Sequence, residues 1–587
     1  MIFSGYICVL TSVIPDYLPA VCIEVSIINF TVTFSGLREQ LLSSVVKQER
    51  PQLEFQRSQL LENITSDLQL LRDLEDKSLS LLQNSQGHIL DDEDLVTTLQ
   101  QSKSMSEEIT VRVKESEEAE KKLNIARKKY LPVAARGAVL YFVVANLSSV
   151  NVMYQFSLTW FHNMFVTCID LSESNPIVVA SQRLSGVLRP SSSRFSKSAS
   201  SHTSSNSEPS PSEGAALNMH MKKMINRLTI NIYKIVSVAL FAHHKLTFSF
   251  MMCSGIMRNN AQVMESDVSE ESKEMALCGM EAITDLEWMV FLQGQVMSTL
   301  MDDTQLQQHD GLSPMQRLEW ESKGTGPTKP RWINPSMWRQ CQHLEALFPV
   351  YDSLCRSIVN NHSQWQIFAD SPDPYTMMQT SYQPTNDQPV DINCITFRWE
   401  KLSSFQHLLL VQILQQSTFV SAVYKFVVEQ MGEDFVQTGS IDLREMFEES
   451  NAKTPLIFIL SPGSDPASQL LRFAKELRGT TLHVDMISLG RGQGPKAEEL
   501  IQKAQILKGR WLFLQNCHLA ASWMPRLQNI VDNFNKPDSD VDPQFRLWLS
   551  SKPDRSFPVS ILQTGLKSTS TVVCWSVKPR RSMEREV

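Results

Sequence analysis

The carboxyl-terminal part of the chain alternates short apolar runs with helix-like segments, and this alternation limits the possible fold more than any other feature. Five runs are typical of buried strands: Leu456–Leu460, Leu482–Leu489, Trp511–Gln515, Phe545–Leu549 and Val559–Gln563. Three helix-like segments separate the first four runs: Ala467–Leu477, Lys496–Leu507 and Ala521–Asn535. This order predicts a doubly wound α/β sheet, with any ligand at the carboxyl ends of the strands.

Composition narrows the class of protein. The 587 residues leave room for about three or four domains, and the hydrophobic content of 42% and charged content of 20% are typical of a globular chain. A formal net charge of −8 argues against nucleic acid as a partner. The ten cysteines form no C-x-x-C pair, which favours reduced thiols in a cytosolic protein over a zinc site or a disulfide framework.

Two apolar segments raise the question of a membrane. Residues 1–15 lack the Lys or Arg of a signal peptide. Residues 137–169 carry no formal charge, but polar residues such as Asn146 and Asn151 interrupt them. Because exposing these groups to lipid is costly, we expect a core strand followed by a helix, a soluble chain and no membrane partner.

Long helices are predicted between residues 37 and 130. Apolar residues on heptad-like spacing form two seams: Leu60, Ile64, Leu71, Leu74 and Leu81, then Leu95, Leu99, Ile109, Val113 and Leu123. Polar residues occupy the remaining seam positions: Asp67, Ser78, Ser102, Ser106, Ser116 and Glu120. A turn at 84–92 and Pro132 bound the two segments, so we predict an antiparallel coiled-coil hairpin that projects about 50 Å.

The rest of the chain gives weaker patterns. Residues 21–32 alternate like a strand, and residues 189–213 are serine-rich, which indicates a linker or a tract of phosphorylation sites. Helical patterning resumes at Met221, residues 265–330 are polar and interrupted by loops, and helices are expected from Trp332 and over Phe405–Leu414.

The loop after the first strand stands where a phosphate-binding loop would lie. A working loop needs glycine-rich backbone, a Lys for the phosphates and a Ser or Thr for magnesium. Gly463 is present, but Asp465 brings negative charge, Pro466 removes a backbone donor, and no Gly-Lys-Ser/Thr occurs in the chain. We therefore predict no catalytic residue, no metal and no bound cofactor.

Other candidate site residues are ambiguous. Gly490, Gly492 and Gly494 could be a phosphate loop, although a tight turn explains them as well. No acidic pair ends a strand, and Asn516 is either a mimic of a phosphate-sensing residue or, as we favour, a hydrogen-bonding strand terminus. Three further groups have a simple structural interpretation. Cys517 beside His518 is more simply an inert thiol than a nucleophile, and His243 with His244 is more simply a helix surface than a metal site. The tryptophans are more simply packing anchors than a ligand cage: Trp332, Trp338, Trp365 and Trp399.

A series of motifs over residues 16–567, in the same order, resembles dynein heavy chains, and the motif sequences are most similar to the axonemal inner-arm type. They include Asp16–Pro19, Gly87–Asp92, Tyr130–Ala134, Met153–Leu158, His244–Leu246, Leu460–Pro466, Gln515–Leu519 and Phe557–Gln563. The resemblance implies the following parts: 1–36, the end of the fifth AAA large subdomain; 37–130, the coiled-coil strut; 131–260, a helical small subdomain with a disordered insert at 189–216; 261–330, a variable loop-rich segment; 331–454, a helical link; 455–567, the sixth AAA large subdomain without a Walker A motif; and 568–587, a divergent tail.

The resemblance also implies a function. The chain would be a non-hydrolytic ring segment and strut of a microtubule motor for ciliary or flagellar movement, in the axoneme, the cytoskeleton or the cytoplasm. Its partners would be the rest of the heavy-chain ring and the stalk, with light and intermediate chains possible, microtubules reached only indirectly, and ATP and magnesium bound by other modules. The absence of those modules and the divergent tail suggest a fragment, a splice product or a gene-model artefact.

Two alternatives stay open at this stage. One is a divergent P-loop ATPase that uses Gly463 and the glycines at 490–494, against which the missing Lys argues. The other is an axonemal adaptor protein whose coiled coil binds a partner.

Overall fold

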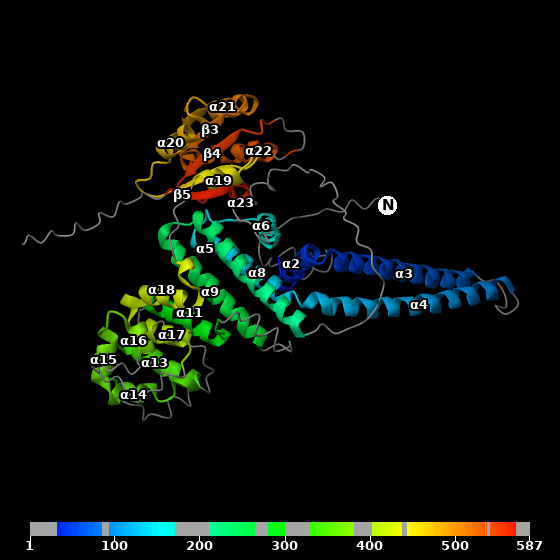
Figure 1. Cartoon of the computed structure of the whole chain (residues 1–587), viewed down its shortest axis with the longest axis horizontal. Coiled ribbons are helices and arrows are strands. Elements are labelled where there is room, and N and C mark those ends of the chain that lie inside the picture. Colours follow the sequence, from blue (N-terminus) through cyan, green and yellow to red (C-terminus); the bar gives the residue numbers. More distant parts are fainter. Residues whose placement is uncertain are drawn as a thin grey trace, which may run out of the picture.

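The computed structural model describes residues 32–84, 93–170, 211–264, 280–299, 329–380, 402–436, 443–534, 536 and 541–570. Several predicted features lie outside these residues: the strand at 21–32 except Val32, the turn after Asn84, the serine-rich tract to residue 210, Trp399 and the tail after Ser570. Figure 1 shows a central group of helices from which two long helices project, with a sheet on one side and a second helical group on the other.

The projecting part consists of α3 (Pro51–Asn84) and α4 (Glu93–Lys128), which we call the arm. It follows α2 (Phe34–Glu49), whose first turn is capped by Thr33: its Oγ1 accepts a hydrogen bond of 3.2 Å from the Gly36 N–H. Pro51 has no N–H to donate back into α2, so it begins a new helix after Arg50.

Burial along the arm follows the predicted seams. On α4, the predicted seam positions are buried at Ser102, Ile109 and Val113 and half-buried at Ser106, Ser116, Glu120 and Leu123. Arg127, outside the predicted set, is also buried. On α3, the half-buried positions include Leu60, Ile64, Asp67, Leu71 and Leu74. Ion pairs join Asp67 to Arg112 at 3.2 Å and Glu54 to Arg127 at 3.1 Å, so the two helices lie side by side and run in opposite directions.

The central group, which we call the helical body, contains α2, α5 (Leu131–Val150), α6 (Leu158–Asp170), α8 (Pro211–Val238) and α9 (Ala242–Met264). The strand expected within residues 137–169 is wrong, because both elements there are helices. In the described part of the chain, α5 alone has the length and apolarity of a membrane span, and 61% of its most apolar window is buried against the body. The predicted insert at 189–216 ends too late, since α8 begins at Pro211.

The second helical group packs on α9 through α18. Its helices are α11 (Asp285–Thr299), α13 (Pro335–Leu347), α14 (Leu354–Asn360), α15 (His362–Asp370), α16 (Pro374–Thr380), α17 (Ser404–Leu414) and α18 (Phe419–Met431), with 3₁₀ turns at Pro349–Tyr351, Gln416–Thr418 and Glu433–Phe435. Helices α13 and α17 confirm the sequence prediction. The segment at 261–330 was predicted to be rich in loops. It contains the helix α11, which buries Phe291 in the core.

The last part is a five-stranded parallel sheet in the order β2-β3-β4-β1-β5. Its strands are β1 (Leu456–Leu460), β2 (Val484–Ser488), β3 (Trp511–Gln515), β4 (Arg546–Ser551) and β5 (Leu566–Ser570). Register pairs Leu456 with both Trp548 and Leu566. The first four strands confirm the predicted runs.

Both faces of this sheet are covered, as a doubly wound fold requires. Side chains such as Phe458, Trp511 and Trp548 pack with α19 (Leu443–Glu449) and α20 (Pro466–Arg478) on one face. Side chains such as Ile457 and Leu512 face α21 (Gly494–Ile506), α22 (Met524–Phe534) and α23 (Val559–Thr564) on the other. Because the connections after β1 and β4 cross opposite faces, the carboxyl ends of these two strands form the switch point of the sheet.

One predicted strand is wrong. Val559–Gln563 forms the helix α23, which begins directly after Pro558 and ends before Gly565. The fifth strand is instead β5, which contains the buried polar residues Lys567, Ser568 and Thr569 and extends past the predicted boundary at 567.

Candidate functional site: the carboxyl edge of the sheet

The loop after β1 lies at the switch point and leads directly into α20. Gly463 has a φ of 80°, a left-handed conformation that glycine adopts without strain. The Ser464 N–H and hydroxyl both donate to the Ser461 carbonyl, at 3.1 and 2.8 Å. These bonds close a tight turn after β1 and bring Asp465 to the start of the helix.

Asp465 caps α20 with its own carboxylate. Oδ1 accepts hydrogen bonds from the N–H groups of Ala467 at 3.1 Å and Ser468 at 3.2 Å, and Oδ2 accepts from the Ser468 hydroxyl at 2.5 Å. The Ser468 hydroxyl and these backbone donors hold the pKa of the Asp465 carboxyl below its usual range. Pro466, in the first turn, has no N–H to offer.

This geometry decides what the helix terminus can bind. A helix N-terminus attracts anions because its first N–H groups lack partners inside the helix and its dipole is positive there. Here a carboxylate of the chain takes those donors, so an incoming phosphate would meet a negative charge in place of free N–H groups. No Lys or Arg lies between Ser461 and Ser468 to offset that charge.

The neighbouring strand ends are tied to one another. Asn516, directly after β3, has a left-handed φ of 56°; its N–H donates to the Ser550 hydroxyl at 3.1 Å and its side-chain amide to the Ser488 hydroxyl at 3.3 Å. Asn516 therefore links the ends of β2, β3 and β4, which supports its interpretation as a hydrogen-bonding strand terminus.

The glycine loop after β2 packs against a tryptophan. Gly492 has a φ of 78°, while a Cβ atom added to Gly494 would lie 2.7 Å from Cδ1 of Trp523. The Trp523 indole N–H donates to Glu498 at 2.9 Å, which holds the ring over the first turn of α21. Nothing lies within 4 Å of a Cβ added to Gly490. The structure thus gives Gly492 and Gly494 roles in the turn and its packing.

The Cys517 and His518 pair is not arranged as a nucleophile and base. Cys517 is fully buried in the 3₁₀ segment η6 (Cys517–Trp523), and burial raises the pKa of its thiol to about 12. Nδ1 of His518 instead accepts a hydrogen bond of 3.2 Å from the Lys552 N–H. A neutral, enclosed thiol is a poor nucleophile.

The remaining candidates lie as expected, except that His244 is half-buried and Trp399 is outside the described residues. His243 is exposed, whereas Nδ1 of His244 lies 3.0 Å from the hydroxyl of the buried Tyr154. Trp338 and Trp365 are buried and Trp332 is half-buried. Among the described residues, no group of three or more His, Cys, Asp or Glu side chains could hold a metal ion.

Sequence reasoning missed the buried cations, of which two lie where parts of the structure join. Arg127, at the base of the arm, and Lys567, in β5, are 3% and 6% exposed. Arg127 lies four residues after the seam residue Leu123, so the heptad frame could have placed it in the seam. Lys567 carried no comparable signal.

Comparison with known proteins identifies the architecture. A family model described as the dynein heavy chain region D6 P-loop domain matches residues 451–569, and one described as the ATP-binding dynein motor region matches residues 6–109. The chain is 35% identical over 573 residues to dynein axonemal heavy chain 6 of Homo sapiens and 33% identical over 556 residues to dynein axonemal heavy chain 1 of the same species. The chain belongs to the dynein heavy chain family.

A third dynein relative is an inner-arm protein by name. The dynein-1-beta heavy chain of the flagellar inner arm I1 complex of Chlamydomonas reinhardtii is 31% identical over 557 residues. These alignments cover 94–95% of the chain but only 10–12% of the relatives. They confirm the resemblance to axonemal dynein heavy chains, while the chain spans about a tenth of their length.

The glycine loop generates a paired prediction. Gly494→Ala should destabilise α21 by about 1–3 kcal/mol, because the added methyl group forces the Trp523 ring to move. Gly490→Ala is the matched control, since its methyl group meets open space. Hydrogen exchange of residues 494–506 in the whole chain measures both effects. Equal protection in the two variants would contradict the packing role of Gly494.

The cap of α20 predicts a pH dependence. Asp465→Ala should weaken the first turn by about 1 kcal/mol, whereas Asp465→Asn keeps an acceptor and should cost less. Because the pKa of Asp465 is lowered in the folded chain, its charge contributes stability above the unfolded pKa of about 3.9, and this stability is lost as the pH falls through the folded pKa. Exchange protection of residues 466–478 in wild type and Asp465→Asn should therefore begin to converge as the pH falls below about 4, and should become equal only below the folded pKa.

Proposed function

We propose that this chain is a non-hydrolytic ring segment and strut of an axonemal dynein heavy chain, working in ciliary or flagellar movement. The arm would be an antiparallel coiled-coil strut that relays nucleotide-driven motion to the stalk. Residues 131–260 would be the small subdomain of the fifth AAA module, 331–454 the link, and 455–567 the sixth module.

The observation that carries the proposal is the arm. Its two helices run in opposite directions and reach away from the helical body (Figure 1). A helix as long as α3, with 34 residues, extends about 50 Å at 1.5 Å per residue. Seam burial at three- and four-residue spacing supports the coiled-coil interpretation. An extended element rooted in a packed body is suited to passing movement between distant sites.

The sheet supports the non-hydrolytic part of the proposal. Asp465 occupies the helix terminus that would hold phosphate, and β3 and β4 end in Gln515 and Ser551 rather than in the acidic residues that bind magnesium. We therefore propose that ATP and magnesium are bound by other modules of the heavy chain. The partners of this segment would be the remaining ring and the stalk, with light or intermediate chains possible and microtubules reached only through the stalk.

Nucleotide binding separates this proposal from the divergent-ATPase alternative. Titration of the 587-residue chain with fluorescent ATP and magnesium should give no saturable binding and no turnover, because no cation offsets Asp465 in the loop. The Asp465→Asn variant is the control for charge alone. It should also fail to bind ATP, because Pro466 is still present and the loop still lacks a Lys. Saturable, magnesium-dependent binding that Asp465→Asn strengthens would instead place nucleotide in this loop.

Replacement of the arm tests the strut. In the complete heavy chain, substituting a short flexible linker for residues 51–128 should leave basal ATP turnover intact. Microtubule-stimulated turnover should fall by about tenfold or more, which is an ordinary coupling free energy between distant sites. Undiminished stimulation would refute the strut. If the same deletion instead removed a bound axonemal protein from pull-downs and left stimulation intact, the adaptor alternative would be correct.

A further inference from the structure

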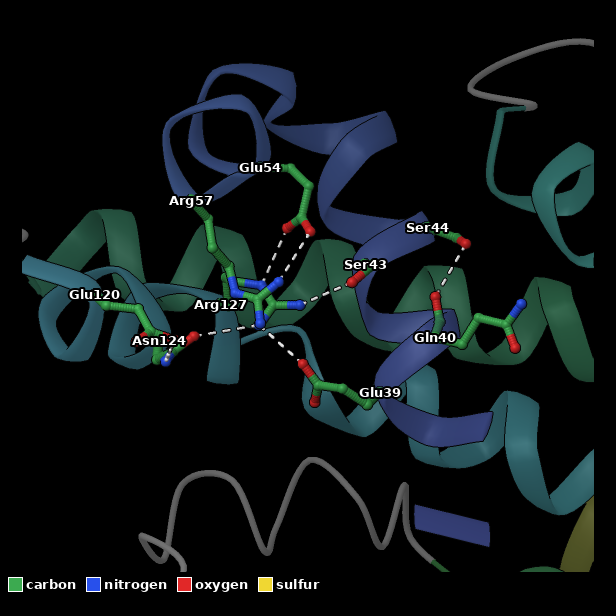
Figure 2. A network of polar contacts seen from close by, with 9 residues as sticks. All are labelled: Glu39, Gln40, Ser43, Ser44, Glu54, Arg57, Glu120, Asn124 and Arg127. Atoms are coloured by element: carbon green, nitrogen blue, oxygen red, sulfur yellow. Dashed lines mark hydrogen bonds and ion pairs between the residues drawn. The ribbon is translucent and has the colours of Figure 1, made fainter. Parts of the chain in front are cut away.

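The base of the arm contains a buried guanidinium that contacts three helices. Arg127 lies in the last turn of α4 and is 3% exposed. Its Nε donates to Glu54 of α3 at 3.1 Å, and its Nη1 donates to Glu39 of α2 at 2.9 Å. Nη2 donates to Ser43 of α2 at 2.9 Å, and Nη1 also reaches Asn124 at 3.3 Å. Figure 2 shows these acceptors around the guanidinium.

The contacts to α2 connect the arm to the body. Glu39 and Ser43 are four residues apart, so they lie on one face of α2. The opposite side of that helix buries Leu37, Leu41 and Val45 in the body, where α2 packs on α5. A bond from α4 to α2 is therefore a bond from the arm to the body.

The covalent connections at this junction are short. Arg50 alone separates α2 from α3, and residues 129–130 separate α4 from α5. Two short connectors hold the arm at its base, so its direction depends on the backbone angles at these residues and on the contacts between the helices that they join. Arg127 lies directly before the second connector, in the last turn of α4, and links α4 to the two helices that flank the first connector.

The chemistry of arginine suits this position. Removing a charge from water is costly unless it is paired and hydrogen-bonded, and here four acceptors from three helices surround one planar group. A guanidinium presents its donors in a fixed fork, whereas an ammonium is a compact point charge. The set of acceptors can therefore be satisfied in one relative arrangement of the helices and not in many.

We infer that Arg127 is the positioning residue that sets the direction of the arm relative to the helical body. This inference rests on the proposed function of the arm as a strut, and it names the group that would make the strut rigid at its root. Loss of the guanidinium would let the arm pivot about Arg50 and residues 129–130 while α3 and α4 remain helical.

Distance measurements on the 587-residue chain test the inference. Dyes are attached through noncanonical amino acids at Glu108, exposed on α4, and at Lys234, exposed on α8 of the helical body. Single-molecule energy transfer should give a narrow distribution in the wild type. Arg127→Lys and Arg127→Met should shift and broaden it, with circular dichroism unchanged.

Arg112 provides the matched control. It lies on the same helix but is 58% exposed, and its one ion pair among the described residues is with Asp67, within the arm. Arg112→Met should leave the distribution unchanged, because exposed ion pairs contribute little. An unchanged distribution in both Arg127 variants would overturn the inference.

A second pair of substitutions keeps the test decisive if the Arg127 variants misfold. Glu39→Ala with Ser43→Ala removes only the acceptors on α2 and leaves the contact to Glu54 in place. A shifted and broadened distribution supports the inference, and an unchanged one overturns it. These measurements involve neither nucleotide nor microtubules, so a failure here is distinguishable from a failure of the arm replacement, which tests the strut itself.

Discussion

The close packing of α5 is the constraint on which the rest of the structure depends. A Cβ atom added to Gly137 would lie 2.5 Å from Cε2 of Phe165, and one added to Gly255 would lie 2.9 Å from Cγ2 of Val143. Helices α6 and α9 can approach α5 this closely only because both positions are glycine. Since α2 and α8 also pack on α5, the root of the arm and the support of the sheet share one densely packed core that resists deformation.

The sheet joins this core through β5. The Thr569 hydroxyl donates to the Leu240 carbonyl at 3.0 Å, and Nζ of Lys567 lies 4.1 Å from the ring centroid of Phe156. Burial lowers the pKa of Lys567 to about 7, while bonds from Nζ to the Leu562 and Gly565 carbonyls, together with the ring, compensate the charged form. Arm, body and sheet thus form one continuous set of contacts, in which the sheet contributes support and its phosphate loop is occupied by Asp465.

Local patterns predicted the sheet well and the helical body poorly. Strands such as Trp511–Gln515 were visible because buried parallel strands are continuous apolar runs. The same rule failed for Val559–Gln563 and α5, because a short apolar run does not distinguish a strand from a buried helix. The strand β5 was not predicted, because Lys567 and Thr569 are polar residues that are nevertheless buried. At the candidate site, the charge of Asp465 and the missing N–H of Pro466 were enough to predict a loop that disfavours phosphate, but the bonds that make Asp465 a cap depend on the turn at Gly463.

The polar residues in the seam of the arm explain why a hydrogen-bonded cation, Arg127, can fix the orientation of the helices at the base of the arm. Ser102, Ser106, Ser116 and Glu120 occupy seam positions, so the two helices share few apolar contacts. Apolar contacts are non-directional, and a well-packed hydrophobic group often stabilises a fold as much as a buried ion pair. An apolar side chain at Arg127 could therefore hold the helices together, but it would tolerate sliding and rotation. Hydrogen bonds from one planar group to three helices restrict both, so the base trades stability for a defined direction of the arm.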